Sequence, residues 1–230
     1  MRIVFAQFPF VMGGLALLGG CAKPDVPPPA APAVVVAAED ESEVEWRNYA
    51  SPADIDRLAR LREDWRNGLA AVRPGRAKRA ITALGALLDP GVALPRPAPP
   101  PGSYRCRVWR LPNSEARASR GFVSYKPFSC HVGADDPLLT FTKQSGSERP
   151  AGRIWPDGDT QLVFLGAMAR GDEQSPPAYG DDAGRNLVGL VERVEPFRWR
   201  MVLPNPVVES RLDVIELVPL VPLMTGEAPS

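Results

Sequence analysis

The sequence predicts a mainly β fold of the α+β class, in which an N-terminal helical pair accompanies about eight antiparallel strands that form a barrel or a strongly curved sheet. Two observations predict it. Short β-like runs, separated by turn residues, recur over roughly the last 120 residues with no helical pattern between them. Ahead of them, apolar residues recur every three or four positions within residues 51–89. A β-sandwich is the alternative arrangement of the same strands.

Charge and histidine content limit the function classes. The 230 residues include 27 Lys and Arg and 27 Asp and Glu, so the formal net charge is zero. Nucleic-acid-binding domains are usually strongly basic, and we therefore expect no nucleic-acid partner. His131 is the single histidine, which leaves little from which to build a Ser-His-Asp triad or a multi-histidine metal site. We expect a protein that is not an enzyme and that carries no cofactor and no metal.

Residues 1–20 have the features of a lipoprotein signal peptide. A positive start at Arg2 precedes a mostly apolar run that is shorter than the roughly 18–20 residues of a membrane-spanning helix. The sequence Leu18-Gly19-Gly20-Cys21 resembles the bacterial lipobox, which implies cleavage before Cys21 and attachment of diacylglycerol to its thiol. Ala22, rather than Asp, implies sorting to the outer membrane, with the protein facing the periplasm. The alternative is an ordinary secretory signal with an incidental cysteine.

Residues 21–45 are predicted to be a tether. Prolines deny the first part regular secondary structure, and an acidic cluster follows. A chain rich in Pro and Ala is stiff and extended, which suits a segment that holds a domain away from a membrane. The prolines are Pro24, Pro27, Pro28, Pro29 and Pro32, and the acidic residues are Glu39, Asp40, Glu41, Glu43 and Glu45.

The helical pair is predicted within residues 46–94. Ser51 is the candidate N-cap, Pro52 occupies the first helical position and Asp54 lies in the first turn. The Pro74-Gly75 pair separates the first helix from a shorter second one, which ends at Asp89. The apolar stripe of the first helix consists of Ile55, Leu58, Leu61, Trp65, Leu69 and Val72.

Residues 95–102 are predicted to be a second proline-rich linker, residues 103–222 a barrel-like domain and residues 223–230 a tail. Apolar and polar residues alternate most clearly from Tyr104 to Val108. The pair Asp157-Gly158 between two apolar runs is a strong hairpin signal. Strands are predicted at 104–111, 122–132, 138–143, 151–155, 161–168, 187–194, 198–203 and 211–218.

The three cysteines divide into one lipid anchor and one pair. With Cys21 lipidated, Cys106 and Cys130 remain, on the first two predicted strands. An oxidising periplasm permits a disulfide between them. It would close a loop of about 25 residues and stabilise the fold by roughly 3 kcal/mol. Two free buried thiols are the alternative.

No catalytic group is predicted. Carboxylates in the last strands lie near arginines along the chain, which favours salt bridges between neighbouring strands over a glycosidase pair; they are Glu192, Glu209, Asp213 and Glu216. His131 is predicted to lie on the surface. Arginine suits carboxylate and phosphate ligands, so Arg105, Arg107 and Arg149 are the candidate residues for binding an anionic envelope molecule. High genomic G+C content is the alternative explanation for these arginines.

Several short segments of the sequence, taken in order, resemble the pattern of a known family. They are Gly102–Arg107, Ser145–Pro150, Leu162–Gly166, Arg198–Val202 and Glu209–Leu217. Together they resemble the DUF4893 domain, an uncharacterised family of alphaproteobacterial envelope proteins, over roughly residues 46–220. The chain departs from the family at Glu148, where the family carries Gln. The resemblance implies that helices and strands form one recurring unit, and it implies no activity.

The sequence favours a non-enzymatic outer-membrane lipoprotein that serves as a binding or interaction module of the cell envelope. Its expected partners are the membrane, through the lipid on Cys21, and an envelope protein or small ligand that the sequence does not identify. An inhibitor of a periplasmic protease or lysozyme is the alternative, and an enzyme acting on wall or lipid is a third. A hollow barrel would favour a carrier, whereas a filled barrel with a projecting ordered loop would favour the inhibitor.

Overall fold

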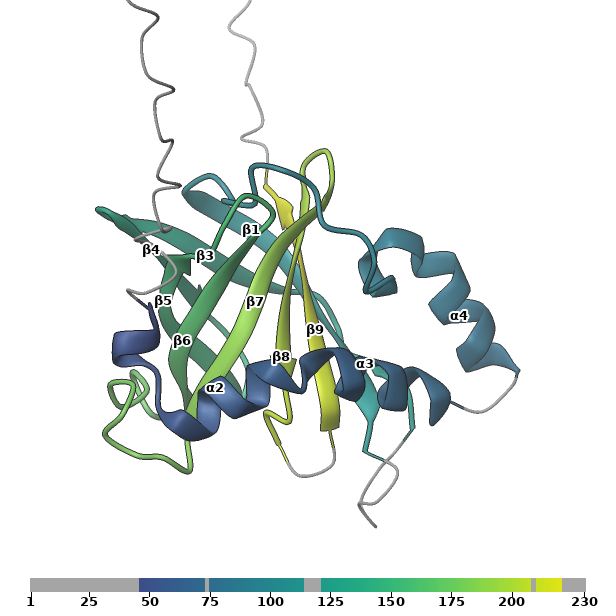
Figure 1. The fold of residues 1–230 in the computed structure, drawn as a ribbon, viewed down its shortest axis with the longest axis horizontal. Coiled ribbons are helices and arrows are strands. Elements are labelled where there is room, and N and C mark those ends of the chain that lie inside the picture. Colours follow the sequence, from purple (N-terminus) through teal and green to yellow (C-terminus); the bar gives the residue numbers. More distant parts are fainter. Residues whose placement is uncertain (1–45, 73–74, 114–120, 208–209, 221–230) are drawn as a thin grey trace, which may run out of the picture. The chain divides into compact units, whose positions relative to one another are not determined.

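Eight antiparallel strands form a closed barrel (Figure 1). The computed structural model describes residues 46–72, 75–113, 121–207 and 210–220. From β3 to β9 each strand pairs with the next, while β1 pairs with both β3 and β9; β2 is an extra short strand beside β1. The β1–β9 pairing closes the sheet, which confirms the barrel and excludes the sandwich. The strands are β1 (Gly102–Pro112), β2 (Val123–Ser124), β3 (Phe128–Asp135), β4 (Leu138–Lys143), β5 (Glu148–Pro156), β6 (Gln161–Arg170), β7 (Asn186–Glu195), β8 (Arg198–Pro204) and β9 (Ser210–Pro219).

The predicted strands match the observed ones with one exception. The strand expected over residues 122–132 is divided into β2 and β3. Pro127 lies in the interruption, where it has no backbone N–H to donate to a neighbouring strand. The predicted turn at Asp157-Gly158 joins β5 to β6, and Gly158 has a φ of 79°, in the left-handed region that glycine adopts without strain.

Three glycines on consecutive strands let the sheet curve enough to close. Gly152 of β5 and Gly166 of β6 are directly paired, and Gly189 lies on β7. A Cβ on Gly166 would lie 2.3 Å from the carbonyl oxygen of Ala151, and one on Gly189 would lie 2.5 Å from the carbonyl oxygen of Val202. Larger residues at these positions would therefore push neighbouring strands apart.

Side chains fill the barrel. Alternate residues of each strand point inward and form one buried cluster, with Tyr104 edge-on to Trp199 and Phe141 edge-on to Phe164. An eight-stranded barrel is just wide enough for side chains to occupy its interior. The lumen is therefore a packed hydrophobic core.

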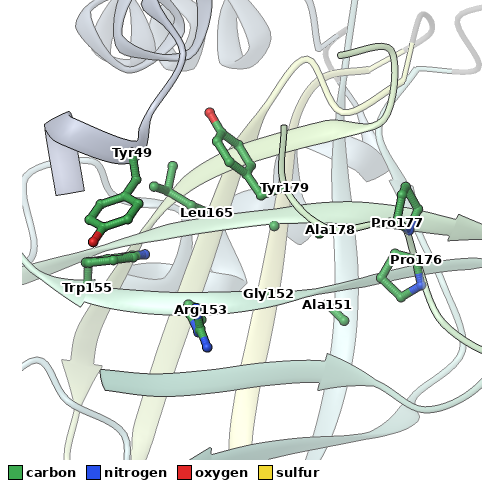
Figure 2. Close-up of a pocket in the computed structure, with 11 residues that line it drawn as sticks. Tyr49, Ala151, Gly152, Arg153, Trp155, Leu165, Pro176, Pro177, Ala178 and Tyr179 are labelled. Atoms are coloured by element: carbon green, nitrogen blue, oxygen red, sulfur yellow. The ribbon is translucent and has the colours of Figure 1, made fainter. Parts of the chain in front are cut away.

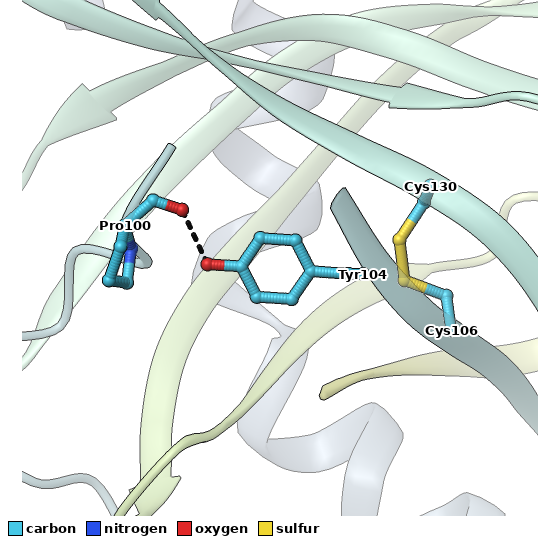
Figure 3. The surroundings of a disulfide bond; sticks show 4 residues. All are labelled: Pro100, Tyr104, Cys106 and Cys130. Carbon is cyan, nitrogen blue, oxygen red and sulfur yellow. Dashed lines mark hydrogen bonds between the residues drawn. A yellow bond between two sulfur atoms is a disulfide. The ribbon is translucent and has the colours of Figure 1, made fainter. Parts of the chain in front are cut away.

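A disulfide joins Cys106 of β1 to Cys130 of β3 inside the barrel (Figure 3). The Cα atoms are 6.0 Å apart, within the usual range for a disulfide. The two cysteines are not directly opposed, because Tyr104 pairs with Cys130 and Cys106 pairs with Phe128. The predicted disulfide is confirmed.

The segment from residue 94 to residue 101, here called the proline strap, lies against one end of the barrel. Leu94 bridges to Arg193 near the end of β7, and the Arg96 amide donates to the Asp159 carbonyl in the β5–β6 turn, at 3.2 Å. Pro97 and Pro99 are buried. From inside the barrel, the Tyr104 hydroxyl donates to the Pro100 carbonyl (Figure 3). The predicted linker therefore covers this end of the lumen.

Helices cover part of the outer wall, beside β1, β7, β8 and β9 (Figure 1). They are α2 (Pro52–Ala59), α3 (Leu61–Ala70), α4 (Arg76–Leu84) and the 3-10 helix η1 (Gly85–Leu88). Ser51 caps α2 by accepting the Asp54 amide at 3.2 Å, as predicted. The expected single first helix is broken at Arg60 into α2 and α3. Among the described residues, no helix combines the length and apolar character needed to cross a membrane.

Arg200 of β8 joins the helical layer to the barrel. Its side chain is fully buried, pairs with Glu192 at 2.6 Å and lies 4.6 Å from the centre of a Trp65 ring. Its guanidinium also donates to four backbone carbonyls in η1 and in the segment that follows it, those of Ala86, Leu87, Asp89 and Val92. One buried cation thus fixes the chain segment that leads from the helices to the strap.

Replacing Arg200 tests this role. We predict that Arg200→Leu lowers the free energy of unfolding by about 3–5 kcal/mol, because it leaves Glu192 as an uncompensated buried charge. Arg198→Leu on the same strand is the matched control. Its ion pairs are partly exposed, so the expected loss is about 1 kcal/mol or less. Urea unfolding followed by tryptophan fluorescence measures both; equal losses would contradict the assignment.

Alkaline pH tests the contact between barrel and strap. Burial raises the pKa of Tyr104 from 10.0 to about 12, so the folded state favours the neutral phenol. This contribution to stability is complete below pH 10 and is lost as the pH rises through about 12. We predict that the unfolding free energy of the wild type falls more steeply over this interval than that of Tyr104→Phe. Denaturant titrations across the interval measure it, and parallel curves would count against the prediction.

Candidate functional site

The structure does not bring the three candidate anion-binding arginines into one pocket. Arg105 and Arg107 lie on the outer wall of β1, whereas Arg149 lies on β5, and strands β3 and β4 separate β1 from β5. Arg149 donates to the carbonyls of Gly146 and Gly171, each at 2.6 Å. Its guanidinium therefore binds the ends of two loops. Cys21, the predicted lipidation site, lies outside the described residues.

The predicted surface histidine and salt bridges are present. His131 is exposed. Glu192 pairs with Arg200 across β7 and β8, and Glu216 pairs with Arg198 across β8 and β9, at 2.7 Å. Glu209 lies outside the described residues. Glu192 and Glu216 thus form ion pairs between neighbouring strands, as the sequence favoured.

A charged cluster lies inside the barrel, at the end opposite the proline strap; it contains Asp213, which the sequence placed in a cross-strand salt bridge, and Arg110, which the sequence did not identify as its partner. Arg110 of β1 donates two hydrogen bonds to Asp213 of β9, at 2.7 and 2.6 Å, and Asp213 also accepts from the Ser210 hydroxyl. The charged ends of Arg110 and Glu148 are 3.3 Å apart. Arg110 and Asp213 are directly paired in the sheet, so strand register places this ion pair.

Burial and charge act in opposite directions on the pKa values of this cluster. Burial alone would lower the pKa of Arg110, but the hydrogen bond and the charge of Asp213 outweigh burial and raise it. Burial lowers the pKa of Lys143, although the charge of Glu148 opposes the change. A pocket of about 410 Å³ lies beside the cluster. Arg110 and Asp213 satisfy each other's hydrogen-bonding groups. The pair therefore closes this end of the packed lumen with polar side chains.

No group of three or more His, Cys, Asp or Glu side chains that could hold a metal ion occurs in the described part of the chain.

A pocket with aromatic sides lies on the outer wall, over β5 and β6 (Figure 2). This aromatic groove has a volume of about 480 Å³. The Tyr49 ring lies 4.6 Å from the Trp155 ring and is tilted by 32° from it, while Tyr179 stands on another side of the groove. The lining residues are Tyr49, Ala151, Gly152, Arg153, Trp155, Leu165, Gly166, Pro176, Pro177, Ala178 and Tyr179.

Both aromatic sides of the groove are tied to the fold. Tyr49 belongs to a helical turn over residues 46–49, which Trp46 anchors by donating to Asp157 at 2.9 Å. Tyr179 lies in the loop between β6 and β7; its hydroxyl hydrogen-bonds to the buried Asp54 carboxylate and accepts the Ser51 amide at 2.9 Å. The N-cap of α2 therefore also positions the Tyr179 ring.

Small residues form part of the floor of the groove. Ala151 and Gly152 lie on β5, whose backbone pairs with β4 on one side and β6 on the other. Arg153 is exposed and pairs with Asp135 at 2.8 Å. The indole nitrogen of Trp155 is buried and has no hydrogen-bond partner among the residues that the structure describes. Figure 2 shows the nitrogen end of this indole directed along the floor of the groove.

An unpaired buried N–H is costly, and native structures rarely retain one without a partner. In this groove it is a hydrogen-bond donor beside the exposed ring of Tyr49. The arrangement can bind a ligand that combines an apolar surface with a hydrogen-bond acceptor.

Comparison with known proteins identifies a family for this chain but no individual relative. No curated protein and no solved structure matches the chain. The family model described as "Domain of unknown function (DUF4893)" matches residues 46–217, a span that begins with the helical turn and ends in β9. The match covers helices, strap and barrel together, as the resemblance implied. The chain belongs to the DUF4893 family.

Proposed function

We propose that this protein is a non-enzymatic cell-envelope lipoprotein whose barrel domain is a binding module, with the aromatic groove as its binding surface. Acyl chains on Cys21 would hold it in the outer membrane, with the barrel facing the periplasm. The observation that carries the proposal is the open groove with two tethered aromatic sides and an unpaired indole N–H.

The packed lumen supports a surface site over an internal one. The cluster inside the barrel includes Phe141 and Met201, each at most 1% exposed. The proline strap lies over one end, and the Arg110–Asp213 ion pair occupies the other. A ligand inside the barrel would displace buried core side chains, at a cost of several kcal/mol. A ligand in the groove would displace no core side chain of the lumen.

The exposed aromatic residue of the groove supports a role in recognition. Tyr49 is 60% exposed, although burying a large aromatic ring is favourable. Aromatic anchors on rigid scaffolds supply much of the binding energy at interaction sites. The disulfide supports the location, because such bonds persist in oxidising compartments such as the periplasm.

A second candidate function, inhibition of a periplasmic hydrolase, rests on Phe197. This residue is 76% exposed at the tip of the β7–β8 turn and has a φ of 59°. An ion pair between Glu195 and Arg198 spans the turn at 3.1 Å. A projecting apolar side chain on an ordered turn suits insertion into the cleft of an enzyme.

Replacing Cys21 tests the lipid anchor. We predict that Cys21→Ser abolishes labelling by radioactive palmitate and releases the protein from the membrane fraction, because the acyl chains would provide the membrane affinity. Cys106→Ser is the control and should keep the label. Labelling that persists in Cys21→Ser would overturn the lipoprotein assignment.

Photocrosslinking in living cells tests the binding surface. We predict that p-benzoylphenylalanine in place of Tyr49 gives a discrete adduct with an envelope component, whereas the same group in place of Arg62, an exposed residue of α3, gives none. An adduct with a hydrolase at Phe197, and none at Tyr49, would instead establish the inhibitor. Equal adducts at Tyr49 and Arg62 would refute the groove as a specific site.

A further inference from the structure

We propose that the aromatic groove binds a proline-rich chain in the extended polyproline II conformation. This inference rests on the proposed function, because it names the ligand class for the same surface. It is argued from the hydrogen-bonding groups of the groove, its shape and its charge.

The groove offers hydrogen-bond donors and almost no acceptors among its side chains. Trp155 supplies an unpaired indole N–H and Arg153 a guanidinium. No lining side chain is a carboxylate or an amide, and the Tyr179 hydroxyl is already bonded to Asp54 and Ser51. A proline-rich chain is the complementary ligand, because its carbonyls accept hydrogen bonds while proline nitrogens donate none.

The shape of the groove fits an extended chain with rings on its sides. Its floor at Ala151 and Gly152 is low, whereas Tyr49 and Trp155 rise at one end and Pro176 and Pro177 at the other (Figure 2). Proline rings pack well against aromatic faces, and the preformed polyproline II helix loses little entropy on binding. The ligand therefore lies along β5 and β6, with its proline rings between Tyr49 and Trp155 at one end of the groove and Pro176 and Pro177 at the other.

Other ligand geometries suit the groove less well. A peptide that adds as a β-strand needs a free sheet edge, but β5 and β6 are paired on both sides. A glycan would bring many hydroxyl donors, and the lining side chains offer few acceptors for them. A donor left unpaired on binding costs affinity.

Charge adds a preference at one side of the groove. The side chain of Arg153 is 60% exposed, and its partner Asp135 is 42% exposed. An ion pair this open exchanges partners at little cost. An acidic residue beside the prolines of the ligand would therefore bind more tightly than a neutral one.

Binding must also move one side chain. The Trp155 nitrogen is buried in the free protein, so a ligand carbonyl reaches it only when the neighbouring Tyr49 ring turns aside. Tyr49 is 60% exposed, which gives its ring room to turn. Tyr49 would then cover the bound proline rings.

Calorimetric titration of the full chain in mild detergent tests the inference. The probes are acetyl-decaproline, the same peptide ending in Asp, and a glycine-serine peptide of equal length. We expect saturable binding of both proline peptides, tighter for the acidic one, and none of the glycine-serine peptide. Tyr49→Ala should weaken binding about tenfold, as loss of an aromatic anchor does, and Trp155→Phe about fivefold, as loss of one hydrogen bond does. Phe197→Ala, which removes an exposed aromatic ring on a distant turn, should leave affinity unchanged.

A chitotetraose titration separates failure of this inference from failure of the proposed function. Binding of chitotetraose that requires Tyr49, with no binding of decaproline, overturns the proline-rich ligand while the groove remains a binding surface. Decaproline affinity that is equal in the wild type and Tyr49→Ala overturns the inference as well. No binding of any probe, together with no Tyr49 crosslink in cells, overturns both.

Discussion

The guanidinium of Arg200 holds the helical layer, the proline strap and the barrel in one arrangement. It bonds to one carboxylate and four backbone carbonyls, and it lies against an indole ring. A fully buried charge is stable only when its partners are complete. The chain from η1 to residue 92 must therefore follow one path over β8, and that path delivers the strap to the end of the barrel.

With the strap and the helices fixed, the barrel is a scaffold rather than a container. Its interior is packed, so ligand recognition falls to the outer wall. The aromatic groove is assembled there from three separate parts of the chain: the turn that carries Tyr49, the β6–β7 loop that carries Tyr179, and the floor of β5 and β6. Gly152 and Gly166, which let the sheet curve, occupy inward-facing positions of their strands, whereas Ala151, Arg153 and Leu165 face the groove.

Much of the fold was predictable because each barrel strand buries one face, so apolar and polar residues alternate along it. The same local logic identified the cap at Ser51 and predicted that Glu192 and Glu216 take part in ion pairs between neighbouring strands. The break at Arg60 was not predictable, since the apolar stripe continues through it. The division of β2 from β3 had a visible signal in Pro127.

The candidate site was less predictable because it depends on which strands become neighbours. Arg105 and Arg149 share a residue type, but strands β3 and β4 lie between the strands that carry them. Trp155 is buried, yet its nitrogen end borders the groove. Tyr49 and Tyr179 are far apart along the chain and belong to no motif.

Nuclear magnetic resonance of the full chain, with labels on the Trp155 indole nitrogen and the Met201 methyl group, tests most directly whether ligands bind the outer wall. Met201 is fully buried in the lumen. On addition of acetyl-decaproline, the account predicts that the Trp155 indole signal shifts and the Met201 methyl signal stays in place. A shift of Met201 with an unmoved Trp155 indole would show that the ligand enters the barrel and would contradict the account.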